Sequence, residues 1–240
     1  MIKLEKKESI YFLTMDAGEN RWNTTFVREI AKALDTIEDD EGPGALITSS
    51  TDSKFFSNGL DLDWMQAPED HPDGGDREVF GEEFMYLMGR FITLPIPTIC
   101  ALNGHTFGAG FMFALSHDFR IMREDRGFLC ANEMQLGLPI PRPELALFKH
   151  KIPANAFFET VQLSKRWTGT DALKAGIVQG VSSVEELPEA AERKAKELAP
   201  LANNRKNFGH QKEMLYGENA AINLTHGPAY MLKNSTDFEV

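Results

Sequence analysis

The chain has 240 residues, enough to bury the core of a single α/β domain, and its 42% hydrophobic and 25% charged residues are typical of a globular protein. Its formal net charge of −11 argues against general nucleic-acid binding, which requires a basic surface, but still allows an anionic ligand held by local basic residues. No apolar run approaches the length of a transmembrane helix, so we expect no membrane partner.

The cysteines and the two ends of the chain indicate a compartment. Cys100 and Cys130 both lie in apolar runs, which favours buried free thiols over a disulfide and suits a reducing environment. Residues 1–8 lack the apolar core of a signal peptide, and residues 237–240 carry no peroxisomal address. We therefore expect a cytoplasmic protein.

Two strands and a helix are predicted at the N-terminus. Residues 1–8 and 10–15 read as two antiparallel strands, and residues 19–23 form a turn. Asn23 or Thr24 is placed to cap the helix that follows. The helix is indicated by apolar residues at helical spacing, namely Phe26, Ile30, Ala33, Leu34 and Ile37.

A first glycine-containing junction follows a strand-like run at residues 45–48. Its sequence is K-F-F-S-N-G-L-D-L, residues 54–62, and it turns through Asn-Gly into one or two helical turns at residues 62–66. Residues 67–76 combine prolines, glycines and acidic residues, and they are the best candidate for a mobile loop.

A second helix is predicted before Pro95 and Pro97. Apolar side chains recur there at helical spacing, which is typical of a helix packed on the core, although the same stripe could border a ligand pocket. These residues are Phe80, Phe84, Leu87, Met88 and Phe91.

A second glycine-containing junction occupies residues 103–115, N-G-H-T-F-G-A-G-F-M-F-A-L, between a strand-like run at 98–102 and a helix beginning near Gly108. The first N–H groups of such a helix lack intrahelical partners and lie at the positive end of its dipole, so they can receive an anion or a developing oxyanion. The glycines fit neither G-x-G-x-x-G nor a P-loop. On this pattern alone, close packing of strand against helix is the simpler interpretation.

Short elements are predicted in the rest of the chain. Residues 118–122 and 127–130 are two more strands, and residues 156–163 are helical. A capped helix ends at Gly176 and is followed by a strand. Residues 188–198 form an amphipathic helix, and polar helical pieces follow from Ala202.

Taken in order, F-S-N-G-L-D-L, P-T-I-C-A-L-N-G-H-T-F-G-A-G-F and N-E-M-Q-L-G-L resemble the crotonase family of enoyl-CoA hydratases and isomerases, over residues 1 to about 180. The resemblance implies an α/β fold, a crotonase-like spiral of repeated ββα units. It implies an acyl-CoA-binding core at residues 1–180 and a C-terminal helical region at 181–240, used for trimerisation or as an active-site cover. The expected partner is an acyl-CoA thioester with no separate cofactor, and the expected assembly is a homotrimer or a dimer of trimers.

The resemblance also implies an oxyanion hole made by the backbone N–H groups of Leu60 and Ala109. Because both donors belong to the main chain, the Leu and Ala side chains are acceptable there. Arg21, in the turn before the first helix, is a phosphate contact to coenzyme A or else a solvated turn arginine. The other residues expected to bind substrate are Lys54, Asn58, Gly59, Asp61, Gly108, Met112 and Glu144.

Up to two glutamates carry protons in this family, and one of the two positions is changed here. The first position corresponds to Met112, which can neither take nor give a proton, and the second corresponds to Glu133. Hydration needs one group to activate water and another to deliver a proton, whereas moving a double bond from C3 to C2 needs a single carboxylate. With Glu133 as the only proton shuttle, the resemblance is closest to single-glutamate Δ3,Δ2-enoyl-CoA isomerases of fatty acid β-oxidation.

Several alternatives stay open. Glu144 could point into the pocket as a second acid, and Asp61 could cap a helix instead of binding substrate. Ser116, His117 and Asp118 spell out a hydrolase triad, but neighbouring side chains diverge, and no spacing suggests a metal site. Other family activities (a hydratase, a thioester hydrolase or a carbon–carbon lyase) or a non-catalytic acyl-CoA-binding protein would use the same glycine junctions.

Overall fold

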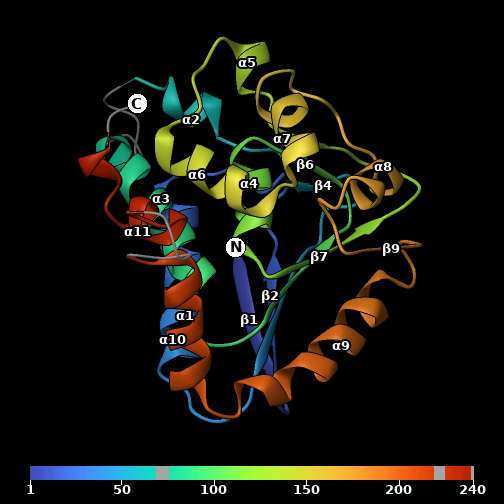
Figure 1. Cartoon of the computed structure of the whole chain (residues 1–240). Coiled ribbons are helices and arrows are strands. Elements are labelled where there is room, and N and C mark those ends of the chain that lie inside the picture. The colour runs from blue at the N-terminus through green and yellow to red at the C-terminus, as the bar shows by residue number, and fades with distance from the viewer. Residues whose placement is uncertain (69–75, 219–224, 239–240) are drawn as a thin grey trace.

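The structure, a computed structural model, describes residues 1–68, 76–218 and 225–238, so most of the loop expected at residues 67–76 lies outside the described residues. Its strands form two sheets (Figure 1). The larger sheet contains β1 (Ile2–Lys7), β2 (Ile10–Met15), β3 (Ala45–Ser50), β5 (Thr98–Leu102), β7 (Phe119–Arg123) and β9 (Gly180–Ser182), in that order. The smaller sheet contains β4 (Phe55–Ser57), β6 (His105–Phe107) and β8 (Leu129–Cys130).

The helices lie on both sides of the larger sheet and around the smaller one. Their bounds are α1 (Thr24–Glu38), α2 (Leu62–Met65), α3 (Arg77–Thr93), α4 (Ala109–Ser116), α5 (Glu133–Leu136), α6 (Arg142–Lys151), α7 (Ala154–Val161), α8 (Gly169–Lys174), α9 (Leu187–Leu198), α10 (Arg205–Tyr216) and α11 (Pro228–Lys233). The side chain of Asn23 caps α1 by accepting from the Phe26 N–H at 2.9 Å, as the sequence predicts.

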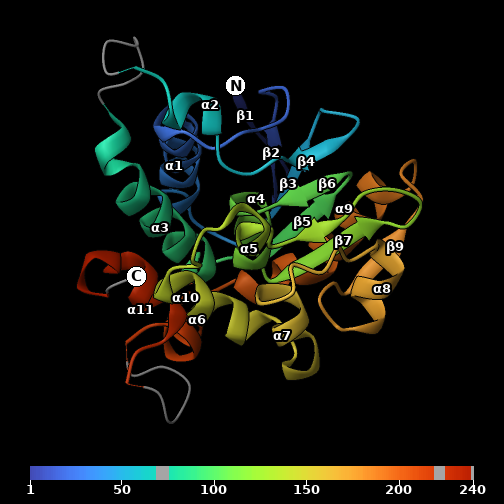
Figure 2. The ribbon, with the colours of Figure 1, turned by 90° about the horizontal axis from the view of Figure 1, so that it is seen from above.

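Strand pairing follows a regular rule along the chain. β1 and β2 form the predicted antiparallel pair, and every later pairing in either sheet is parallel. The first strand of each repeat (β3, β5, β7) joins the larger sheet, and the second (β4, β6, β8) joins the smaller one, before the chain continues into helix. Figure 2 shows β3, β5 and β7 side by side with β4 and β6 beside them. The expected spiral of ββα units is therefore confirmed.

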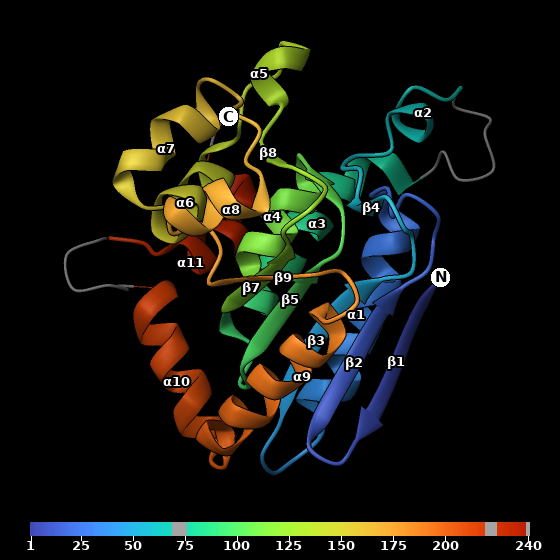
Figure 3. The same cartoon turned by 90° about the vertical axis from the view of Figure 1, so that its right-hand side faces the viewer.

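Alternating side chains on the larger sheet separate two layers of core. One layer packs against α9, which lies along the sheet in Figure 3, and its residues are Ile10, Ala45, Ile47, Ile99, Ala101 and Ile121 with Leu187, Ala191 and Ala195. Their strand neighbours Leu46, Cys100 and Met122 belong instead to the main core, which includes the buried faces of α1, α3 and α4. Successive side chains of a strand point to opposite faces of the sheet, and each face is covered by one of these two core layers. The strands are therefore apolar at consecutive positions.

The C-terminal helices pack onto the same body. α10 and α11 contact α3, and α11 also contacts α6. The ammonium of the buried Lys212 in α10 lies 2.7 Å from the partly buried carboxylate of Asp118 and 3.0 Å from the carbonyl oxygen of Ile96. The expected boundary between residues 180 and 181 falls inside β9, which pairs with β7. Among the residues described, no helix is both long enough and apolar enough to cross a bilayer.

Candidate active site

Three segments that follow the strands of the smaller sheet line one cavity. β4, β6 and β8 run parallel, and their carboxyl ends therefore lie at the same edge of the sheet. The segments that leave these three ends are brought together although they are far apart in sequence. The cavity has a volume of about 490 Å³, and these segments contribute Asn58, Gly59, Leu60, Gly108, Ala109, Asn132 and Glu133 to its wall.

The two glycine junctions touch each other so closely that side chains would not fit between them. A Cβ atom on Gly59, which has a φ of +84°, would lie 2.8 Å from the carbonyl oxygen of Phe107 and 3.8 Å from the amide nitrogen of Ala109. A Cβ atom on Gly110 would lie 2.6 Å from that of Ser57. Glycine is therefore required for packing, and the same close packing brings the amide of Ala109 next to the first junction.

Two backbone N–H groups at these junctions are available to a ligand. Leu60 and Trp22 form a parallel β-bridge. In this bridge the hydrogen bonds are made by the N–H and the carbonyl of Trp22, so the N–H of Leu60 points away from Trp22. Ala109 is the first residue of α4 and has no intrahelical acceptor. Within the described part of the chain, neither N–H donates to a protein acceptor.

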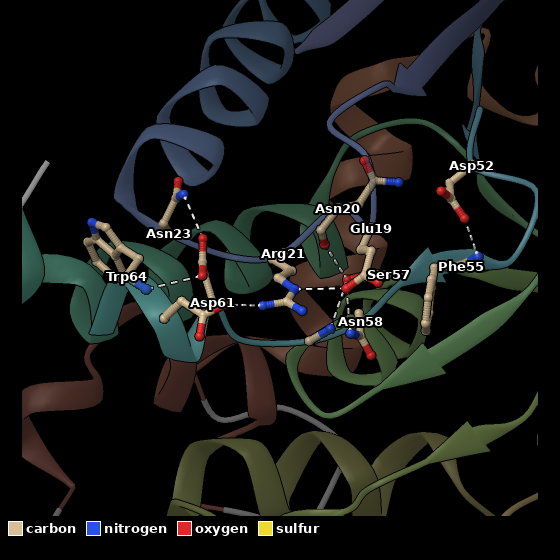
Figure 4. Close-up of polar contacts among 12 residues, drawn as sticks. Glu19, Asn20, Arg21, Asn23, Asp52, Phe55, Ser57, Asn58, Asp61 and Trp64 are labelled. Carbon is tan, nitrogen blue, oxygen red and sulfur yellow. Dashed lines mark hydrogen bonds and ion pairs between the residues drawn. The ribbon is translucent and has the colours of Figure 1, made fainter. Parts of the chain in front are cut away.

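The turn before α1 holds the first junction in place, as Figure 4 shows. The Asn58 N–H donates to the carbonyl of Glu19 at 2.9 Å, and the Asn58 side-chain amide donates to the Glu19 carboxylate at 2.8 Å. The Ser57 hydroxyl donates to the carbonyl of Asn20 at 2.7 Å and accepts from the indole N–H of Trp22 at 3.1 Å. The position of Leu60 is thus fixed by contacts from two sides.

Arg21 lies at the cavity wall within the same network. Its guanidinium donates to the carboxylates of Glu19 at 2.9 Å and Asp63 at 2.8 Å. The hydrogen bond from Asn58, and secondarily the one from Arg21, lowers the pKa of Glu19. A phosphate at Arg21 would compete with two carboxylates. Arg77, which the sequence did not single out, is a second cation on the cavity wall, and it donates to the carbonyls of Ala67 and Pro68.

Glu133 is placed against the second glycine junction. It follows β8 and begins α5, and its Oε1 lies 3.3 Å from the point that a Cβ on Gly108 would occupy. Its Oε2 is buried and has no hydrogen-bond partner among the described residues. Burial raises the pKa of the Glu133 carboxyl, which makes it a stronger base once ionised. The Oδ1 of Asn132, also missed from the sequence, lies 3.4 Å from the same point on Gly108.

A second carboxyl enters the cavity from α6. Glu144 lies in the first turn of that helix and lines the cavity together with Glu133. Burial, and then the negative charge of Glu133, raises the pKa of Glu144 to about 8. At neutral pH, Glu144 is therefore mostly protonated, and it is a second carboxyl beside Glu133.

Three residues expected to bind substrate do not line this cavity. Lys54 precedes β4, about 10 Å along the strand from the junction, and its exposed ammonium lies 4.7 Å from the centre of the Phe55 ring. Asp61 caps α2 by accepting from the Trp64 N–H at 3.2 Å, which is the alternative role that the sequence allowed. Met112 is fully buried in the main core beneath the junction.

The remaining walls are largely apolar. α3 contributes Arg77, Phe80, Gly81, Phe84 and Met85, so part of its apolar stripe borders the cavity, while Leu87, Met88 and Phe91 are in the core. Other apolar residues of the wall come from α2, from the end of α5 and from the segment between α5 and α6, namely Leu62, Met65, Leu136, Leu138, Pro139 and Pro141.

The contiguous Ser-His-Asp does not assemble as a triad. Both ring nitrogens of the buried His117 have other partners, the Phe113 carbonyl at 2.9 Å and the Thr48 hydroxyl at 2.8 Å. The Ser116 hydroxyl donates to the carbonyl of Met112 at 3.1 Å. Across the residues that the structure describes, no three His, Cys, Asp or Glu side chains come together as a metal site.

Comparison with known proteins gives a consistent result. The sequence model of the family described as enoyl-CoA hydratase/isomerase matches residues 5–225. Enoyl-CoA delta isomerase 2, peroxisomal, of Arabidopsis thaliana is 33% identical over 227 residues, which cover 92% of this chain and 95% of the relative.

Solved structures agree with this match. An apo enoyl-CoA isomerase of Mycobacterium tuberculosis superposes with a TM-score of 0.77 at 25% identity, covering 88% of this chain and 89% of that one. Human mitochondrial delta3-delta2-enoyl-CoA isomerase shares the fold, with a TM-score of 0.76 at 24% identity, covering 89% of this chain and 82% of that one.

Proposed function

The chain belongs to the enoyl-CoA hydratase/isomerase family, and on that premise we propose that it is a Δ3,Δ2-enoyl-CoA isomerase. The enzyme moves a double bond from C3 to C2 of an enoyl-CoA. Glu133 removes a proton from C2, the resulting enolate is held as a thioester oxyanion, and the proton returns to C4. The reaction is redox-neutral, and the carboxylate is regenerated at the end of each turnover.

The observation that carries this proposal is the placement of Glu133. Its carboxyl lies against Gly108, the residue just before Ala109, at the edge of the sheet where the unpaired N–H groups of Leu60 and Ala109 also lie. An α-proton of a thioester is too weakly acidic for an unaided carboxylate. Two preorganised N–H donors lower that barrier, and one such donor is typically worth about 2.7–4 kcal/mol.

One observation favours a second candidate activity. Although Met112 occupies the usual second carboxylate position, Glu144 brings another carboxyl to the cavity from α6. A pair of carboxyls, one ionised and one protonated, is what the addition of water to a 2-enoyl-CoA requires. Hydratase activity is therefore the alternative to be tested beside isomerisation.

A substrate panel tests the proposal directly. The protein is incubated separately with 3-enoyl-, 2-enoyl- and saturated acyl-CoAs, and the products are identified by mass spectrometry and NMR. Isomerisation converts the 3-enoyl thioester without change of mass. A mass gain of one water from the 2-enoyl thioester would instead assign hydration, and release of free coenzyme A would assign thioester hydrolysis.

We also propose a homotrimer or a dimer of trimers as the assembly. The resemblance to the family supports it, and α10 leaves the apolar side chains of Met214 and Leu215 exposed in the single chain. Light scattering at micromolar protein concentration measures the mass. A monomer in that experiment would count against this assembly without affecting the isomerase proposal.

A further inference from the structure

The packing of the described residues does not explain why one position of the cavity wall, Gly81, is a glycine. Gly81 lies in the interior of α3, where glycine is less favourable than alanine because it loses more backbone freedom. It is four residues after Arg77 and four before Met85, and all three line the cavity. Residues at this spacing share one helix face, so a side chain at position 81 would project into the cavity.

At Gly89, the other glycine of α3, packing does require a glycine. A Cβ on Gly89 would lie 2.6 Å from Lys233 Cγ and 3.1 Å from the carbonyl oxygen of Ala229, so close contact with α11 excludes any side chain there. A Cβ on Gly81 would have no described atom within 4 Å. Packing within the described protein therefore accounts for Gly89 and not for Gly81.

The surroundings of Gly81 indicate what fills the space. Leu62 is 38% exposed, Met65 37%, Leu136 52% and Leu138 44%, and all four of these apolar side chains line the same cavity. Together with Phe80 and Phe84 they form an apolar wall on α2, α3 and the segment after α5. Large apolar side chains that line a cavity and remain exposed to solvent favour the binding of an alkyl chain, because a bound chain would remove them from contact with water.

We propose that Gly81 is a specificity-determining residue, whose missing side chain leaves a subsite for the distal carbons of the acyl chain. The substrates are then enoyl-CoAs of medium or long chain length, and short-chain thioesters leave this subsite empty. The inference rests on the proposed function, because it takes the ligand to be an acyl-CoA thioester. Gly81 acts by shape alone and takes no part in proton transfer.

Binding of saturated acyl-CoAs tests the subsite without requiring turnover. Butyryl-, octanoyl- and dodecanoyl-CoA are titrated by calorimetry into the wild type, Gly81→Ala, Gly81→Leu and Val79→Leu. Burial of one methylene corresponds to about a fourfold gain in affinity, so wild-type affinity should rise with chain length. Gly81→Leu should leave butyryl-CoA affinity within about twofold and weaken dodecanoyl-CoA binding roughly 10²-fold, the effect of about three or four methylenes no longer buried.

The other variants keep the result interpretable. Gly81→Ala adds one methyl group in the same direction and favours the helix, so it should fold at least as well and weaken dodecanoyl-CoA to a smaller extent. Val79 is on the same helix but lines a different hollow, beside α1, and its substitution should change no affinity. Circular dichroism and thermal melting check the fold of each variant.

The outcomes separate the two proposals. Equal weakening of all three thioesters by Gly81→Leu, or unchanged dodecanoyl-CoA binding, would overturn the role of Gly81 while leaving the acyl-CoA assignment intact. Failure of the wild type to bind any of the thioesters would overturn that assignment, and this inference with it.

Discussion

At the scale of single residues, Glu133 is the group whose replacement separates binding from chemistry. Glu133→Gln keeps the size and polarity of the side chain but removes its capacity to accept a proton. We expect isomerase turnover to fall by roughly 10²–10⁴-fold, the range typical of a general acid–base group, with acyl-CoA affinity nearly unchanged. Steady-state kinetics with a 3-enoyl-CoA and calorimetry with a saturated acyl-CoA measure the two quantities. Unchanged turnover would transfer the role to Glu144.

Ionisation of Glu144 should make kcat/KM depend on pH. Its pKa is raised to about 8, so the group is neutral below that pH and becomes a second negative charge in the cavity above it. That charge opposes formation of the enolate, and kcat/KM should decline as pH rises through about 8. On the acid side, kcat/KM should decline as Glu133, whose pKa is raised by burial, becomes protonated.

The Glu144→Gln variant tests whether Glu144 causes the decline of kcat/KM at alkaline pH. The amide cannot ionise, so the decline near pH 8 should disappear while the acid limb stays where it was. Rate measurements between pH 5 and 10, with the stability of each variant checked over the same range, provide the comparison. An alkaline limb that persists in Glu144→Gln would show that another group titrates there.

The sequence identified some of these residues and not others, for a physical reason. Leu60, Ala109 and Glu133 belong to short contiguous motifs that resemble those of the crotonase family, so the resemblance could name them position by position. Asn132, Arg77 and Glu144 reach the cavity only through the packing of α3, α5 and α6 around it. Tertiary contacts of that kind leave no local pattern in the chain, so Glu144 could be named from the sequence only as one possibility.

At the scale of elements, contact between α4 and β4 determines where the Ala109 N–H lies. Gly110→Ala would place its Cβ 2.6 Å from Ser57 Cβ, and the helix must move to relieve that contact. We expect a loss of about 1–3 kcal/mol in the free energy of unfolding and a lower kcat/KM, since a displaced donor no longer meets the thioester oxygen. Urea denaturation and steady-state kinetics measure both effects.

The matched substitution for Gly110→Ala is Gly81→Ala. It also lies within a helix, but its Cβ meets no described atom within 4 Å, so helix propensity should stabilise the protein by up to about 1 kcal/mol. If the two substitutions changed stability equally, the close approach of α4 to β4 would not be what requires Gly110.

The sequence does not indicate the short strands β4 and β6 or the ten-residue helix α6. The strands of the larger sheet are predicted from apolar or alternating runs, except the last, which is predicted to follow the helix ending at Gly176. Phe26, Ile30, Ala33, Leu34 and Ile37 are all buried on α1, as their spacing indicates. β4 and β6 have three residues each, too few for a period-two pattern to be recognised, and both run directly into glycine turns. Two of the three strands that position the site are therefore less visible in the sequence than the strands that form the core.

At the scale of the whole molecule, one buried ion pair ties the C-terminal part of the chain to the larger sheet. Lys212 of α10 reaches Asp118, which also accepts from the Thr98 N–H at 2.9 Å. Lys212→Met would remove the cation that contacts the partly buried Asp118 carboxylate, while Lys151 remains nearby, so we expect the free energy of unfolding to fall by less than the about 3–5 kcal/mol typical of a fully buried pair. Urea denaturation followed by circular dichroism gives the value.

A surface pair provides the control for Lys212→Met. Lys196 contacts Glu192 at 2.6 Å on the exposed side of α9, where water screens the attraction, and Lys196→Met should leave the stability almost unchanged. Similar losses in the two variants would mean that the buried pair contributes no more than an ordinary surface contact.

The unpaired amides of Leu60 and Ala109 have a consequence for hydrogen exchange. Most amides in the surrounding strands and helices are held in backbone hydrogen bonds and exchange only when the structure opens. These two are held by none within the described chain, and both residues are partly exposed, so their hydrogens should be replaced by deuterium rapidly in the ligand-free protein. When one thioester oxygen accepts from both, their exchange should slow together, while that of the neighbouring strands stays the same. NMR-detected exchange with and without a saturated acyl-CoA would thus reveal occupancy of the site in an enzyme that is not turning over.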